Sequence, residues 1–172
     1  EVDFLEAVQG AKKRLTLSDG KTLEVNIQAG TEDGQTLRLK GQGLPGQGGA
    51  ANGDAFVEVS VRPHPFFERE GTDILLECPI SLTEAILGGT ITVPTIDGKV
   101  ALKVPKGSNT GTQLRLKGKG VPDAKTGKAG DLYIRFVVVL PKEIDGDLEE
   151  LVDRWSKSHG YGYSVRDKLI KE

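Results

Sequence analysis

Two glycine-rich stretches are the first places in this sequence where residue spacing could support chemistry. Residues 41–46 have the G-x-G-x-x-G spacing of a dinucleotide-binding loop, and residues 118–120 place a lysine between glycines, as phosphate-binding loops do. A dinucleotide loop must join a strand to a helix, but Pro45 and further glycines follow the first pattern. No Ser or Thr follows Lys119 to bind a magnesium ion. We therefore predict no nucleotide and no other cofactor.

The reactive side chains are few and widely spaced. His64 and His159 are the only histidines, too few for a three-ligand metal site. Cys78 is the only cysteine, and it falls in an apolar stretch where a buried, inert thiol is the ordinary outcome. A single thiol cannot form an internal disulfide, which fits a reducing cytoplasm. We predict no catalytic residue, no metal site and no enzyme activity.

The composition is that of an ordinary soluble protein. The 172 residues are 37% hydrophobic and 28% charged, with a net charge of −2. This charge offers no basic excess for nucleic acid or anionic lipid, and the apolar runs are too short to cross a membrane. Because methionine is absent even at position 1, we expect a fragment of a longer protein.

An internal repeat determines the predicted organisation. The phrase Gly-x-x-x-Gly-x-x-Leu-Arg-Leu-Lys-Gly-x-Gly-x-Pro begins at Gly30 and again at Gly107. A repeat of this length indicates one structural unit used twice. The 23 glycines and frequent turn dipeptides favour short strands. We predict a mainly all-β fold of two tandem β-sandwich-like subdomains, residues 1–71 and 72–141, followed by a helical tail, residues 142–172.

Each predicted subdomain contains one short helix and a similar series of strands. The helices are expected at residues 4–10 and 82–88, each ended by glycine. Hairpins turn at Asp19-Gly20, between strands 13–17 and 23–27, and at Asp97-Gly98, between strands 90–93 and 100–104. Further strands are predicted at 55–61 and 132–140. A strand at 74–78 precedes the second helix, and its counterpart would lie before residue 1, so the first subdomain is expected to lack its opening strand.

The tail carries an amphipathic pattern. One helical face collects Leu148, Leu151, Val152 and Trp155. Asp147 and Glu150 have the spacing of a capping box, and a further short helix can start at 164–167. From the pattern alone, this apolar face either packs on its own chain or pairs with a second one.

Two features of the first subdomain admit two interpretations. A basic run at residues 12–14 precedes the alternating Leu15 and Leu17, and Phe66 and Phe67 stand near the end of the subdomain. They form either a solvated edge strand with an aromatic core pair, or a groove that takes an extended peptide as an additional strand.

Several motifs in order resemble the C-terminal substrate-binding region of DnaJ-type J-domain co-chaperones. The motifs are Phe4-Leu5-Glu6-Ala7-Val8-x-Gly10, the repeated Leu-Arg-Leu-Lys-Gly-x-Gly, His64-Pro65-x-Phe67-x-Arg69-x-Gly71-x-Asp73, Glu84-Ala85-x-Leu87-Gly88-Gly89, Val93-Pro94-Thr95-x-Asp97-Gly98 and Gly130-Asp131-Leu132. The sequence is similar to the zinc-free, CbpA-like branch. Four Cys-x-x-Cys-x-Gly-x-Gly motifs mark the zinc-bearing branch, whereas here residues 17–21 form a tight turn and one cysteine exists.

The resemblance implies a stress-response chaperone module of the cytoplasm. It would hold exposed apolar segments of non-native polypeptides and, in the full-length protein, deliver them to a DnaK-type chaperone. Matching positions place Leu15, Leu17 and Phe67 in the client pocket. They place Lys12 and Lys13 at its rim, where an acidic tail of the partner chaperone docks in some relatives. The tail face formed by Leu148, Leu151, Val152 and Trp155 would join a homodimer.

Two alternatives remain at this stage. Some CbpA-like relatives bind nucleic acid, but only residues 72–141 contain more basic than acidic side chains, so this function is not favoured. A purely structural dimerisation scaffold is the other alternative, and it would not bind unfolded peptide.

Overall fold

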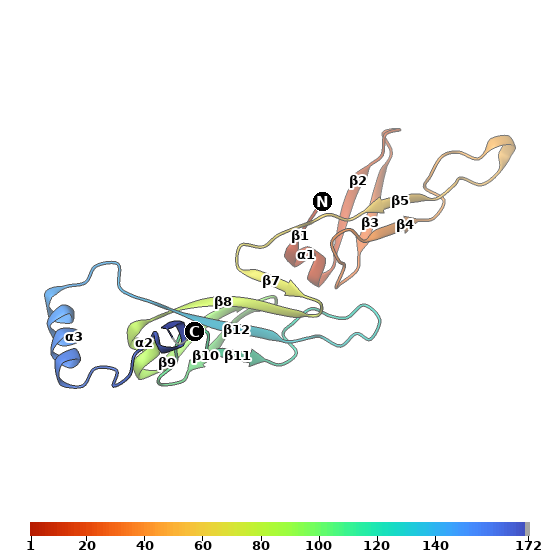
Figure 1. Ribbon diagram of the computed structural model, residues 1–172. Coiled ribbons are helices and arrows are strands. Elements are labelled where there is room, and N and C mark those ends of the chain that lie inside the picture. The colour runs from red at the N-terminus through yellow and green to blue at the C-terminus, as the bar shows by residue number, and fades with distance from the viewer. Residues whose placement is uncertain (171–172) are drawn as a thin grey trace. The chain divides into compact units, whose positions relative to one another are not determined.

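The computed structural model describes residues 1–170, which fall into two compact units: residues 1–138 and the tail from Val139 onward. The first unit contains two similar modules, which we call the first module (residues 1–62) and the second module (residues 67–138). Its β strands and short helices confirm the mainly-β prediction (Figure 1). Among residues 1–170, no helix is long and apolar enough to cross a membrane.

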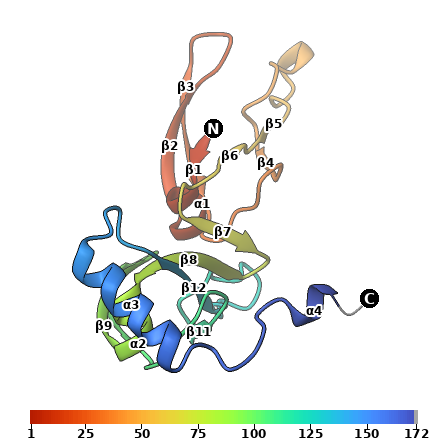
Figure 2. The same cartoon turned by 60° about the vertical axis from the view of Figure 1, so that its left-hand side comes forward.

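The first module consists of short strands and one short helix. In chain order these are β1 (Val2–Asp3), α1 (Phe4–Gln9), β2 (Ala11–Thr16), β3 (Thr22–Ile27), β4 (Thr36–Leu39), a 3₁₀ turn (Gln47–Gly49), β5 (Ala55–Glu58) and β6 (Val61–Arg62). Antiparallel pairs β2–β3 and β4–β5 form separate two-stranded ribbons, which rise from the region of α1 (Figure 2).

The second module repeats this order with longer strands. Its elements are β7 (Phe67–Glu70), β8 (Asp73–Ser81), α2 (Leu82–Leu87), β9 (Gly89–Thr95), β10 (Gly98–Val104), β11 (Gln113–Leu116) and β12 (Leu132–Val139). A four-stranded sheet has the order β11-β12-β8-β7, and β9–β10 is a separate antiparallel pair.

The two module helices begin and end in the same way. The backbone N–H of Asp3 donates to the Glu6 carboxylate at 2.9 Å, and the N–H of Ser81 donates to the Glu84 carboxylate at 2.8 Å. Each helix stops at a glycine of positive φ whose N–H bonds the carbonyl of that same glutamate. Identical local chemistry therefore sets both helices at the same place in the repeat.

A strand of two residues opens the first module, although the counterpart of residues 74–78 would lie before residue 1 as expected. Val2 and Asp3 form β1, which pairs in parallel with Val61 and Arg62 of β6. They stand before α1 as Ile80 and Ser81 stand before α2. The predicted strand ends at residue 78, whereas β8 continues for three more residues to Ser81, and Val2 and Asp3 correspond to the last two of them.

Strand β7 belongs to the sheet of the second module. Phe67 pairs with Leu76 and Glu70 with Asp73, so β7 and β8 form a hairpin. The boundary predicted between residues 71 and 72 falls in the turn of this hairpin. Residues 67–70, predicted to lie in the first subdomain, thus pair with the second, because strand pairing joins them to β8.

The unit has two apolar cores of unequal size. The larger one surrounds Leu132, Ile134 and Phe136 of β12, which are fully buried. It also includes Phe4 and Val8 of α1, so this helix packs into the core of the second module. The smaller core consists of Val2, Ala7, Val25, Ile27 and Val59.

The tail contains helices α3 (Gly146–Ser158) and α4 (Asp167–Ile170). The N-cap of α3 is Asp145, whose carboxylate accepts the Leu148 N–H at 2.9 Å. The capping box predicted at Asp147 and Glu150 is therefore wrong, because the N-cap lies two residues before Asp147 and the helix starts at Gly146.

Candidate peptide-binding surfaces

The β2–β3 hairpin presents one apolar and one polar face. Lys13 and Leu15 alternate along β2 with the exposed Lys12 and Arg14, and Leu17 continues the partly buried side beyond the strand end. Because successive side chains of a strand point to opposite faces, Leu15 and Lys13 lie on the same face of β2, and Lys12 lies on the opposite face.

Leu15 lies at the open margin of the smaller core. It packs, partly buried, against that core together with Leu37, Leu39 and Val61. The positions that correspond to Leu15 and Leu17 in the second module are Val93 and Thr95, which are only 1% and 7% exposed. We call the partly exposed surface of Leu15, Leu17, Leu37 and Leu39 the hairpin face.

The two lysines predicted at the rim of a groove have different surroundings. Lys13 Nζ lies 2.7 Å from the Glu6 carboxylate of α1, and this hydrogen bond is the main reason why the pKa of Glu6 is lowered. Lys12 Nζ pairs with Glu24 at 3.2 Å on the opposite face of the strand. Lys13 therefore lies beside the hairpin face, whereas strand alternation turns Lys12 away from it.

Phe67 occupies a different environment from Leu15. Its side chain is 6% exposed and belongs to the larger core, with Ile74 and Leu76. Its ring stacks against Phe4 with centroids 6.1 Å apart, and the centroid of the His64 ring is 4.7 Å away. The structure thus places Phe67 in one core and Leu15 in the other, since β7 pairs with β8.

A cavity of about 670 Å³ opens beside Phe67. We call it the linker cavity, because residues 63–66, between the modules, form one of its walls. His64 shapes this wall, since its Nδ1 accepts the backbone N–H groups of Phe66 and Phe67 at 3.1 and 3.2 Å. The lining residues are Phe4, Pro63, His64, Pro65, Phe66, Phe67, Glu68, Arg69, Leu75, Glu77, Pro79 and Val137.

The sequence patterns do not indicate this cavity. The family resemblance places Phe67 in the client pocket of the first subdomain. The one signal in the sequence is the run of ring-bearing residues at 63–67, Pro-His-Pro-Phe-Phe. In the structure, the His64 ring lies 5.7 Å from the centroids of both Phe4 and Phe66.

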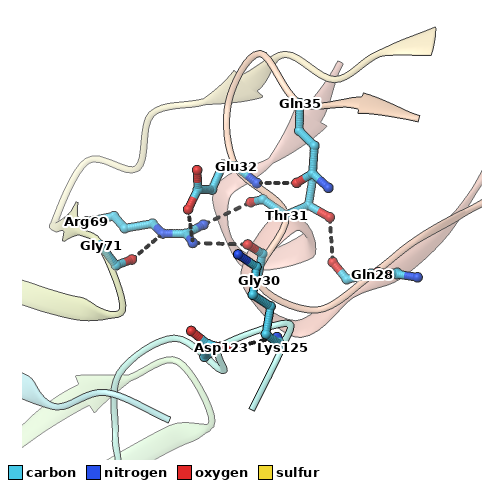
Figure 3. A network of polar contacts seen from close by, with 9 residues as sticks. All are labelled: Gln28, Gly30, Thr31, Glu32, Gln35, Arg69, Gly71, Asp123 and Lys125. Carbon is cyan, nitrogen blue, oxygen red and sulfur yellow. Dashed lines mark hydrogen bonds and ion pairs between the residues drawn. The ribbon is translucent and has the colours of Figure 1, made fainter. Parts of the chain in front are cut away.

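Arg69 holds the two modules together beside the linker cavity (Figure 3). Its Nε donates to the Gly71 carbonyl at 2.8 Å, and its two Nη atoms donate to the carbonyls of Thr31 and Gly30 at 2.9 and 3.0 Å. The guanidinium also lies 3.7 Å from the Glu32 carboxylate. Three of the five N–H donors of Arg69 are thus bonded to backbone carbonyls of the protein.

Cys78 is placed as a core residue. It lies in β8, its side chain is buried in the larger core, and burial is the main reason why the pKa of its thiol is raised. A thiol that resists ionisation is a poor nucleophile.

The four predicted dimerisation residues all lie on α3. Leu148 is partly buried, whereas Leu151, Val152 and Trp155 are about half exposed within this chain. The Trp155 ring meets Tyr161 edge-on, with centroids 5.6 Å apart. The tail thus has an aromatic and aliphatic surface that its own residues cover only in part.

Comparison with known proteins assigns the fold to a family. The family described as DnaJ C terminal domain matches residues 1–141. The chain belongs to this family. It is 46% identical over 150 residues to a protein named Chaperone protein DnaJ from Clostridioides difficile (strain 630), which covers 87% of this chain and 39% of that protein.

Two further relatives of the DnaJ family have the same name. The protein from Neisseria meningitidis (strain ATCC 700532 / DSM 15464 / FAM18) is 47% identical over 137 residues, which are 80% of this chain and 37% of that protein. The protein from Haloarcula marismortui is 43% identical over 151 residues, which are 88% of this chain and 39% of that protein. The chain thus spans under half the length of the curated relatives it matches.

Proposed function

We propose that this DnaJ-family chain is a non-enzymatic substrate-binding module that holds exposed apolar segments of non-native polypeptides. The observation that carries the proposal is the hairpin face. Leu15 and Leu17 remain partly exposed there, although the corresponding positions of the second module are buried. An extended apolar segment that covers these side chains would remove them from water.

An extended client can also use backbone hydrogen bonds. The β2–β3 ribbon has only two strands, so β2 has one unpaired edge in the described sheet. Such an edge can accept a further strand, while a neighbouring apolar surface selects its side chains. Lys13 beside this surface is paired with Glu6, so an acidic client residue would have to share this lysine with the Glu6 carboxylate.

The energy of one such contact is modest. Burying one leucine or phenylalanine of a client contributes about 1.5–3 kcal/mol. Ordering a flexible chain offsets much of this gain. A single hairpin face therefore binds weakly and reversibly, which suits transient holding.

A homodimer would carry two hairpin faces, and these would together bind a client more strongly than one does. We propose that the α3 face with Leu148, Leu151, Val152 and Trp155 forms a homodimer, because three of these side chains are half exposed in the single chain. A second contact within one dimer is intramolecular and can raise avidity by about a hundredfold or more.

The branch and the cellular partner are also proposals. Leu17 N–H bonds the Lys21 carbonyl at 2.8 Å, which closes the β2–β3 turn within five residues and supports the zinc-free branch. In the full-length protein we expect delivery of the client to a DnaK-type chaperone in the cytoplasm, by analogy with the relatives named DnaJ.

Direct binding to an unfolded chain tests the proposal. A fluorophore-labelled, reduced and alkylated protein serves as a permanently unfolded probe, and its native form serves as the control. We expect the anisotropy of the unfolded probe alone to rise as this chain is added. A chain that dimerises but leaves both probes unbound would instead be a structural scaffold.

A further inference from the structure

The linker cavity has the shape and lining of a site for a large apolar side chain. Phe4 and Phe67 form a buried aromatic floor, and Leu75 and Val137 add aliphatic surface from the outer face of the four-stranded sheet. Phe66 stands at the cavity with 65% of its surface exposed. A volume of about 670 Å³ accommodates one or two large side chains.

The charges around the linker cavity are predominantly acidic. Glu68 and Glu77 line it, and no lysine does. Arg69 is the single lining arginine, and its guanidinium is directed to three backbone carbonyls and paired with Glu32 at 3.7 Å. Arg135 pairs with Glu77 at 2.8 Å, yet the Glu77 side chain stays 63% exposed. Within residues 1–170, Glu68 makes no ion pair, so its carboxylate is available to a cation.

The cavity also follows the edge of a sheet. Strand β7 is the outermost strand in the order β11-β12-β8-β7, and Phe67, Glu68 and Arg69 of β7 all line the cavity. An edge strand beside an apolar cavity suits an extended chain, because that chain can align with the strand while one side chain enters the cavity.

We propose that the linker cavity is a second peptide-binding site, which takes a Phe, Leu or Ile side chain of an extended segment with a Lys or Arg beside it. The occupant is a non-native polypeptide segment, so in this respect the inference rests on the proposed function. The charges differ, because the hairpin face has the paired Lys13 and Glu6 at its side whereas the linker cavity has Glu68 and Glu77.

Two labelled peptides test this assignment on the full chain. Both have the same central Phe-Leu pair, flanked by lysines in one and by glutamates in the other, and fluorescence anisotropy gives their affinities at low salt. We expect the lysine-flanked peptide to bind about threefold to tenfold more tightly to the cavity, the range that one or two exposed ion pairs provide.

Single substitutions inside and outside the linker cavity show where the labelled peptides bind. Phe66→Ser should weaken binding of the lysine-flanked peptide at least about threefold, since an exposed apolar wall is lost. Glu68→Lys should remove or reverse the preference between the peptides. Leu44→Ser removes an exposed leucine outside the cavity, and Glu58→Lys makes the same charge change on β5, so neither should alter the preference.

The outcomes separate this site from the hairpin face. Because the hairpin face can also bind the Phe-Leu pair, the two affinities are compared in the Leu15→Ser/Leu17→Ser chain. Equal affinities there, or binding unchanged by Phe66→Ser, would overturn the linker-cavity assignment. If Leu15→Ser abolishes binding of unfolded protein while Phe66→Ser changes no peptide affinity, the proposed function stands and the second site does not exist. If Leu15→Ser/Leu17→Ser leaves binding of unfolded protein unchanged while Phe66→Ser weakens binding of the lysine-flanked peptide, the linker cavity is a peptide site and the hairpin-face assignment fails.

Discussion

Leu15 and Phe67 lie in different surroundings, although both were given the same role. Both were predicted to line one client pocket, yet Leu15 is partly exposed at the smaller core and Phe67 is buried in the larger one. Replacing an exposed apolar residue changes a binding surface, whereas replacing a buried one leaves a cavity. The same substitution at these two positions should therefore have different effects.

Phe67→Ser should destabilise the fold. Removing a buried phenylalanine costs about 3–5 kcal/mol, and a serine hydroxyl placed in the core adds to this cost. Leu87→Ser, at a position that is 69% exposed on α2, should change the free energy of unfolding by less than about 0.5 kcal/mol. Urea denaturation measures both, and a Phe67→Ser chain as stable as Leu87→Ser would contradict the placement of Phe67 in the core.

Cys78 should react slowly in the folded chain. Burial raises the pKa of its thiol, so less of the reactive thiolate exists at a given pH. We expect iodoacetamide at pH 8 to modify the native chain far more slowly than the chain in denaturant, as followed by mass spectrometry. Equal rates in the two conditions would show that the thiol is accessible and β8 is not packed as described.

At the scale of elements, the repeat made much of the fold predictable. The duplicated phrase located β4 and β11, and the Asp-Gly turns located the two hairpins, because turn chemistry is local. The partner of β7 could not be predicted, since its pairing with β8 depends on which sheet the strand joins. For the same reason the linker cavity, which gathers residues from α1, β7, β8 and β12, has no signature in the linear sequence.

The contact between the modules should depend on Gly30. Its φ is +83°, and an added Cβ would lie 2.3 Å from the Pro122 carbonyl oxygen, in the second module. Gly20 has the same φ of +83° in the β2–β3 turn, but nothing within 4 Å of an added Cβ. An alanine at either position would have the same unfavourable φ, but only an alanine at Gly30 would also clash with another part of the chain.

Gly30→Ala should consequently lower the melting temperature more than Gly20→Ala does. Both variants should lose about 1 kcal/mol or more from the left-handed backbone, and only Gly30→Ala should lose more from the displaced Pro122 loop. Calorimetry gives the comparison. Equal losses would indicate that the modules do not meet at Pro122.

At the scale of the whole molecule, the proposed dimerisation through the tail would give each particle two binding faces. Cutting the chain after Lys142 removes α3 with Leu151, Val152 and Trp155. We expect light scattering to report a dimer for the full chain and a monomer for the shortened one, because residues 1–138 contain both cores. A dimer that survives the cut would place the interface elsewhere.

The measurement that tests the central claim most directly is suppression of the aggregation of a heat-denatured client. The Leu15→Ser/Leu17→Ser chain is compared with wild type and with Leu87→Ser, at a temperature where denaturation curves show all three chains folded. We predict that wild type and Leu87→Ser suppress aggregation, and that the double variant loses at least about half of this activity because the hairpin face no longer offers apolar surface. Full suppression by a folded double variant would contradict the assignment of client binding to the hairpin face.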